Sequence, residues 1–197
     1  MAQTKKDNIR DRILTSARDR LLKHGYAATT MRSIAAEAGI STSNLYVYFP
    51  SKLALLFAIY DPWLRNRLDE LEETCAAMDD PRARLRVIIT TLWETIPAED
   101  GGFGNTFVEG LAVSGREGGY SRELLLWAED KISALIASCL DAERTNAFGD
   151  TALAHILFMA FDGFAVNYTL IGRSRRLDRC IDVMVEIIAG PETGQPE

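Results

Sequence analysis

The sequence predicts an all-α protein of about nine helices. Apolar residues recur every three to four positions through most of the chain, which is the period of a helix with one buried face. No segment shows the alternation of apolar and polar residues that is typical of a half-buried strand. Glycine, proline and capping residues divide the chain into segments of helical length. A chain of 197 residues is long enough for one large domain or two small ones with a hydrophobic core.

The N-terminal segment is predicted to form a helix over residues 8–24. Its apolar positions recur at helical spacing, Asp7 is a suitable N-cap, and Gly25 can adopt the left-handed conformation that ends a helix. A second helix is expected over 31–38, with Thr30 as its cap and Gly39 at its end. Ser41 then caps a short third helix over 42–48. Two helices joined by a tight glycine-containing turn form a helix-turn-helix.

The rest of the chain is predicted to be helical as well. Pro50 ends the third helix, and Pro62 inside the fourth predicts a kink or a break. Asp80 followed by Pro81 is a strong helix start. The tail after Gly190 is expected to be disordered. The helices expected after the third cover residues 52–78, 81–96, 105–114, 120–142, 150–172 and 177–189.

Charge is divided unevenly along the chain, whose formal net charge is −6. The first 57 residues carry nine basic and four acidic side chains, a net +5, and the remainder carries thirteen basic and twenty-four acidic ones, a net −11. A basic end on an acidic body indicates that the basic end meets a polyanion. A solvated helix face with scattered charges is the alternative, and charge alone does not decide between the two.

No pattern in the chain indicates catalysis or metal binding. Cys75, Cys139 and Cys180 are far apart, His24 and His155 stand alone, and the sequence contains no nucleophile elbow or phosphate loop. We therefore expect no metal, no cofactor and no enzymatic activity. No run of about 18 uninterrupted apolar residues and no secretory leader are visible, so we expect a cytoplasmic protein without a membrane partner.

The predicted third helix presents small polar groups to solvent. Leu45 points inward, and the outward positions carry hydroxyl, amide and phenol groups. Such groups suit base edges and phosphate oxygens in a DNA major groove, which is wide enough to admit a helix. Tyr46 and Tyr48 could instead be core aromatics. Because they are two residues apart on a helix, at least one of them is expected to be exposed.

The N-terminal residues resemble the TetR-type transcriptional regulators. The resemblance covers about 45 to 50 residues from the first helix onward and rests on the stretches TTMRSIAAEAGIS and NLYVYFPSK. It implies a three-helix DNA-binding head over residues 1–50, a ligand-binding and dimerisation body over 51–190, and a tail over 191–197. It also implies a homodimer through the last two helices.

The resemblance further implies which residues contact a double-stranded DNA operator. Positions matching Thr42, Ser43 and Tyr46 approach bases, and those matching Asn44, Tyr48 and Lys52 hold phosphates. Arg32 is a base-reading candidate, and Thr30 lies at a helix start near the DNA backbone. Val47 departs from the family pattern, which often has histidine there, so a backbone contact is lost or exchanged for a thymine-methyl contact.

Aromatic residues gather in the predicted body, with a few polar groups among them. A mostly apolar cavity with a few polar groups is the usual small-molecule site. Simple core packing is the alternative and must account for most of these residues. If Glu109 or Asp162 faces the cavity unpaired, a cationic or hydrogen-bond-donating ligand follows. The ligand-binding candidates are Trp93, Phe103, Phe107, Glu109, Trp127, Phe158, Phe161, Asp162, Asn167 and Tyr168.

The sequence thus predicts a ligand-responsive repressor that binds a palindromic operator as a dimer and is released by a small-molecule effector. A transcriptional activator or a ligand-independent regulator of the same fold is the alternative. A small-molecule-binding protein or an enzyme without DNA binding is the remote one. The sequence does not indicate the effector or the operator.

Overall fold

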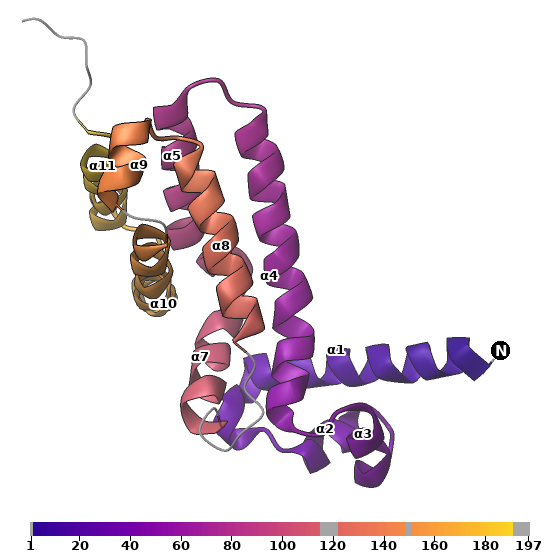
Figure 1. Cartoon of the computed structure of the whole chain (residues 1–197). Coiled ribbons are helices and arrows are strands. Elements are labelled where there is room, and N and C mark those ends of the chain that lie inside the picture. Colours follow the sequence, from indigo (N-terminus) through magenta and orange to yellow (C-terminus); the bar gives the residue numbers. More distant parts are fainter. Residues whose placement is uncertain (1, 115–121, 149–150, 191–197) are drawn as a thin grey trace, which may run out of the picture. The chain divides into compact units, whose positions relative to one another are not determined.

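A computed structural model describes residues 2–114, 122–148 and 151–190, and within these ranges the regular structure is helical throughout (Figure 1). The expected all-α class is confirmed. The chain divides into two compact units, the first formed by Met1–Leu64 with Gly101–Ser121 and the second by Arg65–Asp100 with Arg122–Glu197. This division differs from the one expected at residue 50, because a segment distant in sequence packs with the N-terminal helices.

The first unit contains α1 (Ala2–Ala28), α2 (Met31–Glu37), α3 (Thr42–Tyr48), the first half of α4 (Lys52–Ala76) and α7 (Phe103–Ser114). Its N-terminal helices pack around buried apolar side chains, with Ile13, Ile34 and Leu45 at their centre. α2 contacts both α1 and α3, and α7 lies against α1. Figure 1 shows α2 and α3 as a compact pair beside the start of α4.

Local capping groups define the starts of the short helices as predicted. The Thr30 hydroxyl accepts a hydrogen bond from the amide of Ser33, and the Ser33 hydroxyl accepts one from the amide of Thr30, a reciprocal capping box. Ser41 accepts from the amide of Asn44 at the start of α3. Gly39, at φ 68°, takes the left-handed conformation that turns the chain between the two helices. The helix-turn-helix is therefore confirmed.

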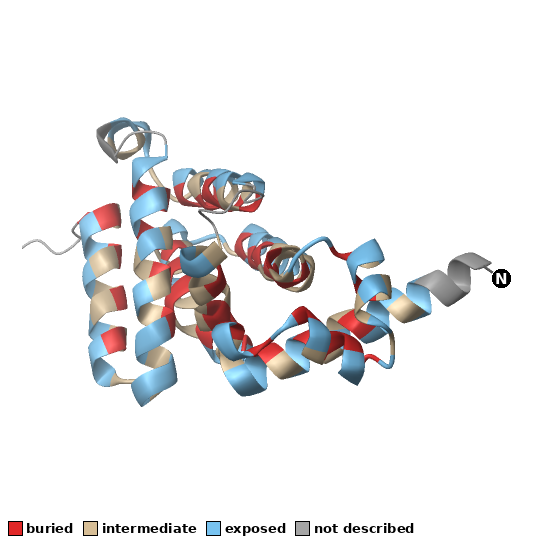
Figure 2. Ribbon diagram, turned by 90° about the horizontal axis from the view of Figure 1, so that it is seen from below, coloured by how far each residue is buried: buried red, intermediate tan, exposed pale blue. Residues whose placement is uncertain are grey.

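The second unit contains the second half of α4 together with α5 (Pro81–Thr90), η1 (Thr91–Thr95), α6 (Ile96–Glu99), α8 (Glu123–Ala137), α9 (Ala142–Phe148), α10 (Ala152–Ile171) and α11 (Arg175–Ala189). α10 packs on η1, α6 and α8, while α11 packs on α5. Within each unit the buried residues line the helix faces that are turned toward other helices (Figure 2). Asp80 and Pro81 start α5 as predicted.

Several elements differ from the sequence-based expectation. α1 begins at Ala2, before the expected start at Asn8, while its helical backbone breaks at Gly25 (φ 75°), where the sequence predicts the end of the helix. α4 runs as one helix with Pro62 inside it, so of the predicted kink or break the break is absent. The expected helix over 81–96 widens into the π turn η1, and α6 and α9 were not expected. The predicted start of a helix at Tyr120 and the predicted disordered tail lie outside the described residues.

The π turn has a local cause in Pro97. Proline has no backbone N–H, so the α-helical hydrogen bond from position 97 to the carbonyl of Trp93 is missing. A widened turn directly before this position lets the helix continue from η1 into α6.

α10 is the one helix of the described ranges that is long and apolar enough to cross a membrane by length and composition. Core helices of soluble proteins pass the same test. Part of α10 is exposed in this chain, and its exposed apolar side chains include Met159, Val166 and Leu170. This surface matters for the assembly considered below.

Replacing Gly110 in α7 with alanine is expected to destabilise the first unit. A Cβ at this position would lie 2.5 Å from Leu56 Cδ2 and 3.0 Å from two ring atoms of Tyr26, and both side chains are buried. Overpacking of this kind costs about 1–3 kcal/mol. Helix propensity alone predicts the opposite sign, a gain of about 0.5–1 kcal/mol. Urea denaturation measures the change in the free energy of unfolding.

Val113→Ala is the matched control for Gly110→Ala, because Val113 lies on the same helix and is exposed. We expect its effect to stay within about 0.5 kcal/mol. A Gly110→Ala variant that is as stable as the unmodified chain, or more stable, contradicts the close packing of α7 on Tyr26 and Leu56.

Candidate nucleic-acid interface and effector-contacting residues

The surface formed by α2 and α3 presents hydroxyl, phenol and guanidinium groups to solvent. Arg32, Ser43 and Tyr46 are exposed, while Thr42 and Asn44 are half-buried. Tyr46 exposes 51% of its surface and the neighbouring Val47 exposes 74%. The structure therefore places most of the predicted base-contacting residues together on the outer side of the short α3. A protruding helix of this kind with polar side chains fits a DNA major groove.

Tyr48 differs from Tyr46 in its surroundings. It is half-buried and packs against the apolar core of the first unit. The expectation that at least one of the two tyrosines is exposed is confirmed, and Tyr46 is the exposed one. The phenol of Tyr48 remains a candidate for a phosphate contact through its outer edge.

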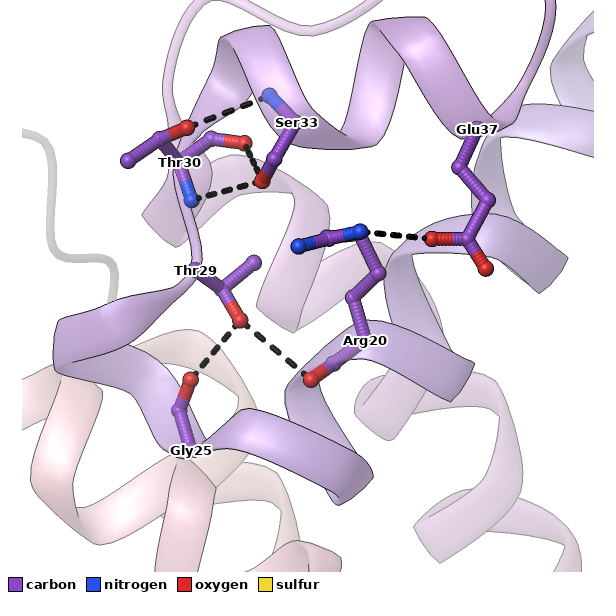
Figure 3. A network of polar contacts seen from close by, with 6 residues as sticks. All are labelled: Arg20, Gly25, Thr29, Thr30, Ser33 and Glu37. Carbon is purple, nitrogen blue, oxygen red and sulfur yellow. Dashed lines mark hydrogen bonds and ion pairs between the residues drawn. The ribbon is translucent and has the colours of Figure 1, made fainter.

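Polar contacts fix the segment that leads into α2 (Figure 3). The Thr29 side chain is fully buried, and its hydroxyl donates to the carbonyls of Gly25 at 2.8 Å and Arg20 at 3.3 Å. One residue later, Thr30 and Ser33 form the capping box. Arg20 on α1 pairs with Glu37 on α2 at 2.9 Å, which ties the two helices together at the surface. The start of α2, and with it Arg32, therefore has a defined position relative to α1.

Lys52, a predicted phosphate contact, is engaged within the protein. Its Nζ donates to the carbonyls of Tyr26 at 2.5 Å and Thr29 at 2.7 Å, and it lies 3.8 Å from the centre of the Tyr26 ring. Burial lowers the pKa of Lys52 from its ordinary value, and the negative charge of Glu109 acts in the opposite direction. The ammonium group thus holds the turn between α1 and α2.

Three of the predicted ligand-binding residues belong to α7 in the first unit. Phe103 and Phe107 stack on Tyr60 of α4, with ring centroids 6.0 and 4.5 Å apart. Glu109 accepts hydrogen bonds from the amides of Tyr26 at 2.9 Å and Ala27 at 3.1 Å. Its carboxylate is therefore paired, so the condition under which it would indicate a cationic ligand is not met.

The second unit contains an aromatic cluster around Trp93 of η1. The Trp93 ring stacks on Phe164 of α10 at 4.4 Å between centroids, and its indole N–H donates to the carbonyl of Leu157 at 3.1 Å. On α10, Phe158 and Phe161 lie 5.9 Å apart. These contacts join η1 to α10 and account for the burial of Trp93 and Phe161.

The remaining aromatic and amide candidates do not join this cluster. Trp127 on α8 lies against two cations, with the Arg65 guanidinium 4.2 Å and the Lys131 ammonium 5.6 Å from its ring centre. Asn167 is exposed, and Tyr168 is half-buried near Arg173 at the end of α10. The ten predicted residues are thus divided between the two units, and within the second unit they do not form one cluster.

Asp162 on α10 is a half-buried carboxylate to which the described part of the chain offers no hydrogen-bond or ion-pair partner. Burial raises the pKa of Asp162 above its ordinary value. An unpaired carboxylate in apolar surroundings attracts a cation or a hydrogen-bond donor. Of the two acidic candidates, Asp162 is the one that meets this condition.

A polar pair that the sequence analysis missed joins α8 to α10. His155 Nδ1 lies 2.5 Å from Glu129 Oε1, and Glu129 is almost fully buried. The two residues are 26 positions apart, and neither forms a recognisable motif. No local pattern could have indicated the contact.

Comparison with known proteins identifies the N-terminal part of the chain. Residues 13–59 match the family described as bacterial regulatory proteins, tetR family. These residues include part of α1, all of α2 and α3, and the start of α4. They therefore contain the exposed polar surface of α2 and α3. They belong to the TetR family. A curated relative of this TetR-family domain, the transcriptional repressor KstR2 from Rhodococcus jostii, is 34% identical over 93 residues, which cover 47% of this chain and 46% of that protein.

Solved structures extend the similarity of fold to nearly the whole chain. Thermus thermophilus FadR, a TetR family transcriptional repressor in complex with lauroyl-CoA, superposes with a TM-score of 0.62 at 22% identity and covers 95% of this chain and 99% of that one. A transcriptional regulator from Saccharomonospora viridis in complex with choline gives a TM-score of 0.65 at 21% identity, with 92% and 96% covered. The helical body that follows the TetR-family domain thus has the fold of these regulators. The chain spans about half the length of KstR2.

Asp162→Asn is expected to remove a pH dependence of stability. Because burial raises the pKa of Asp162, the folded chain binds its proton more tightly than the unfolded chain. Stability contributed by this group is therefore present at low pH and is lost as the pH rises through the raised pKa. The advantage in unfolding free energy of Asp162→Asn over the unmodified chain should grow from about pH 3 to pH 7, measured by urea denaturation.

Asp130→Asn controls for the loss of one negative charge, since Asp130 is exposed on α8 in the same unit. An advantage of Asp162→Asn that shrinks as the pH rises would contradict the unpaired, half-buried state of Asp162.

Proposed function

We propose that this protein is a ligand-responsive transcriptional repressor that binds a palindromic DNA operator as a homodimer. The observation that carries the proposal is the exposed set of Arg32, Ser43 and Tyr46 on α2 and α3, within a TetR-family domain. The net +5 of the first 57 residues supports it, because a basic surface attracts the phosphate backbone. The working compartment of such a regulator is the cytoplasm, and its chemistry is binding rather than catalysis.

We propose separate sets of residues for contacts with bases and for contacts with phosphates. In the proposed complex Thr42, Ser43 and Tyr46 face base edges, and Val47 contacts a thymine methyl. Asn44, Tyr48 and the α2 start at Thr30 approach phosphates, while Arg32 reaches either a base edge or a phosphate. Lys52 contacts the protein itself, because two of its three N–H groups donate to backbone carbonyls. We propose that it positions the turn rather than neutralising a phosphate as its main role.

The partner of α10 and α11 is proposed to be a second copy of this chain. α10 exposes Ile156, Met159, Val166 and Leu170 at positions that recur on one helix face, and Gly163 lies among them with nothing within 4 Å of a Cβ built there. α11 adds Val183 and Ile187. An exposed apolar surface of this kind marks an interface, and two copies would bury it by mutual contact. The same dimer would carry two reading heads for the two half-sites of a palindrome.

The effector is proposed to bind in the second unit and to contact Asp162. The half-buried, unpaired carboxylate beside the aromatic residues of α10 supports a ligand with a cationic or hydrogen-bond-donating group. The related regulator that was solved with choline offers a probe of this class. Unchanged choline affinity in Asp162→Asn, where the unmodified chain binds choline, would contradict this contact.

Release from DNA follows as a shift between two conformations of the dimer. An effector that binds one conformation better lowers operator affinity by its differential affinity for the two. Coupling of about 1–3 kcal/mol changes operator affinity roughly 5- to 150-fold. An activator or a ligand-independent regulator of the same fold is the alternative, and a reporter gene under the selected operator distinguishes repression from activation.

Arg32→Ala and Ser43→Ala are expected to weaken DNA binding in different ways. The test uses an operator selected from random duplexes by the unmodified protein and gel-shift titrations at several salt concentrations. Loss of a cation that contacts phosphate should lower affinity for all duplexes and reduce the salt slope by about 0.9. Loss of the Ser43 hydroxyl should relax preference at one base pair, a change of about 1–3 kcal/mol.

Arg18→Ala is the charge-matched control, since Arg18 is exposed on α1. We expect it to affect binding less than Arg32→Ala does. If neither Arg32→Ala nor Ser43→Ala alters affinity or preference, α2 and α3 do not form the DNA-binding surface.

Leu170→Asp is expected to dissociate the proposed dimer. Leu170 exposes 76% of its surface in the single chain, and a carboxylate buried at an apolar interface carries a large desolvation cost. We expect a dimer dissociation constant at least about a hundredfold higher. Sedimentation equilibrium should detect a species near the chain mass of 21.9 kDa.

Leu126→Asp, at an exposed apolar position of α8, is the control and should leave the dimer intact. An unmodified chain that sediments as a monomer, or a Leu170→Asp variant that stays dimeric, counts against α10 as the dimer surface.

A further inference from the structure

The turn that runs from the break in α1 at Gly25 to the start of α2, residues 25–30, receives polar partners from two other helices of the first unit. Gly25 interrupts α1 with φ 75° and ψ 175°, so the amides of Tyr26 and Ala27 cannot bond to the preceding helical turn. The carboxylate of Glu109, on α7, accepts both amides, at 2.9 and 3.1 Å. A carboxylate at the start of a helical turn is the strongest acceptor for such amides.

Lys52 satisfies the other side of the same turn. Its ammonium binds the carbonyls of Tyr26 and Thr29, so the turn is held between an acidic side chain from α7 and a basic one from α4. The two charges also support each other, because Glu109 offsets the lowering of the Lys52 pKa by burial. Removing the Glu109 charge would therefore weaken the contacts of Lys52 as well.

α7 packs closely on this turn. The backbone of Gly110 approaches the Tyr26 ring and Leu56 without room for a methyl group. One turn further along α7, the Ser114 hydroxyl lies 2.8 Å from the hydroxyl of Tyr26. Displacement of α7 would consequently pull on the backbone between Gly25 and Thr30.

The same turn sets the position of the exposed polar surface of α2 and α3. Thr30 is the N-cap of α2, Arg32 follows two residues later, and α3 packs on α2. The core that joins α1, α2 and α3 is apolar and includes Ile13, Ile34 and Leu45 but not Glu109. The head can therefore stay folded without the Glu109 contacts, while its placement relative to α7 depends on them.

We propose that Glu109 is a positioning residue for operator binding, which ties the placement of α2 and α3 to α7 by holding the amides of the turn at residues 26 and 27. The inference rests on the proposed function and adds to it a residue that positions the DNA-binding helices. Glu109 itself does not touch DNA in this account. Its contribution is to keep the two heads of a dimer at the spacing that the operator requires.

Glu109→Gln tests the proposal with a change of one oxygen to an amide nitrogen. The glutamine can accept only one of the two amide hydrogen bonds, and it carries no charge for Lys52. We expect a loss of affinity for the selected operator of about tenfold, within the range typical of coupled sites. Affinity for an unrelated duplex should stay unchanged, because phosphate contacts do not require the correct head placement.

Asp19→Asn is the matched control, since it neutralises an exposed carboxylate of α1 in the same unit. Electrostatics alone predicts that removing a negative charge strengthens binding to a polyanion, for both variants. The positioning role predicts a loss of operator affinity for Glu109→Gln and no loss for Asp19→Asn. An operator affinity of Glu109→Gln equal to or above that of the unmodified protein overturns the proposal.

Hydrogen exchange of the amides of Tyr26 and Ala27 tests the contact independently of DNA. Both amides should exchange faster in Glu109→Gln, and the amides of the α1 and α2 core should not. Equal loss of operator and unrelated-duplex affinity, with fast exchange throughout the head, would indicate an unfolded head and overturn the claim that the contact acts by placement.

Ser114→Ala is the second variant, because it removes only the hydroxyl contact to Tyr26. It should lower operator affinity by a smaller factor in the same direction, with unchanged unfolding free energy of the head. Wild-type protein that selects no duplex contradicts the proposed function, whereas normal wild-type binding with unaffected variants contradicts only the role of Glu109.

Discussion

The turn between α1 and α2 depends on the pairing of its backbone groups with two distant charges. Gly25 breaks the helical backbone, so the amides and carbonyls that follow need partners from elsewhere. Glu109 supplies acceptors and Lys52 supplies donors, and Thr29 closes the turn from within. Because α2 begins directly after this turn, these contacts set the position of the exposed surface of α2 and α3. The arrangement also explains why α7, 73 residues or more beyond the turn in sequence, forms one compact unit with the N-terminal helices.

The second unit uses its aromatic residues mainly to join helices. Trp93 lies in the π turn before Pro97, and its ring and indole N–H both bind α10. Trp127 pairs with cations at the side of α8 instead. Counting the aromatic residues in the sequence therefore predicts a ligand site that is too large, because most of these residues pack between helices. Asp162 stands apart from this pattern, since no hydrogen bond or ion pair within the described residues compensates the burial of its carboxylate.

The apolar surface of α10 and α11 differs from the core because it is exposed in the single chain. α10 is apolar on nearly all sides, yet one of its faces is exposed in the single chain. A face of this kind gains free energy only when another surface covers it. A second copy of the chain offers the self-complementary contact that two-fold symmetry requires. Such a contact would also cover the exposed face of a helix that is long and apolar enough to cross a membrane.

Local features of the structure were predictable because they depend on neighbouring residues. Thr30, Ser41 and Asp80 cap their helices as expected, since an N-cap bonds to an amide two or three positions away. The exposure of at least one of Tyr46 and Tyr48 followed from helical geometry in the same way. The uninterrupted course of α4 through Pro62 did not follow, because packing against other helices outweighs a local preference.

The sequence by itself determined the helical class, the helix-turn-helix and the residues that face outward on α3, because these depend on spacing along one or two helical turns. Only the tertiary structure decided the roles of Glu109 and Lys52. Both were candidates for contacts with other molecules, and both proved to bind the backbone of a turn that lies 82 or 83 residues from Glu109 and 23 or 26 from Lys52. Spacing along the chain carries no information about such a pairing, since the partner is chosen by which helices pack together.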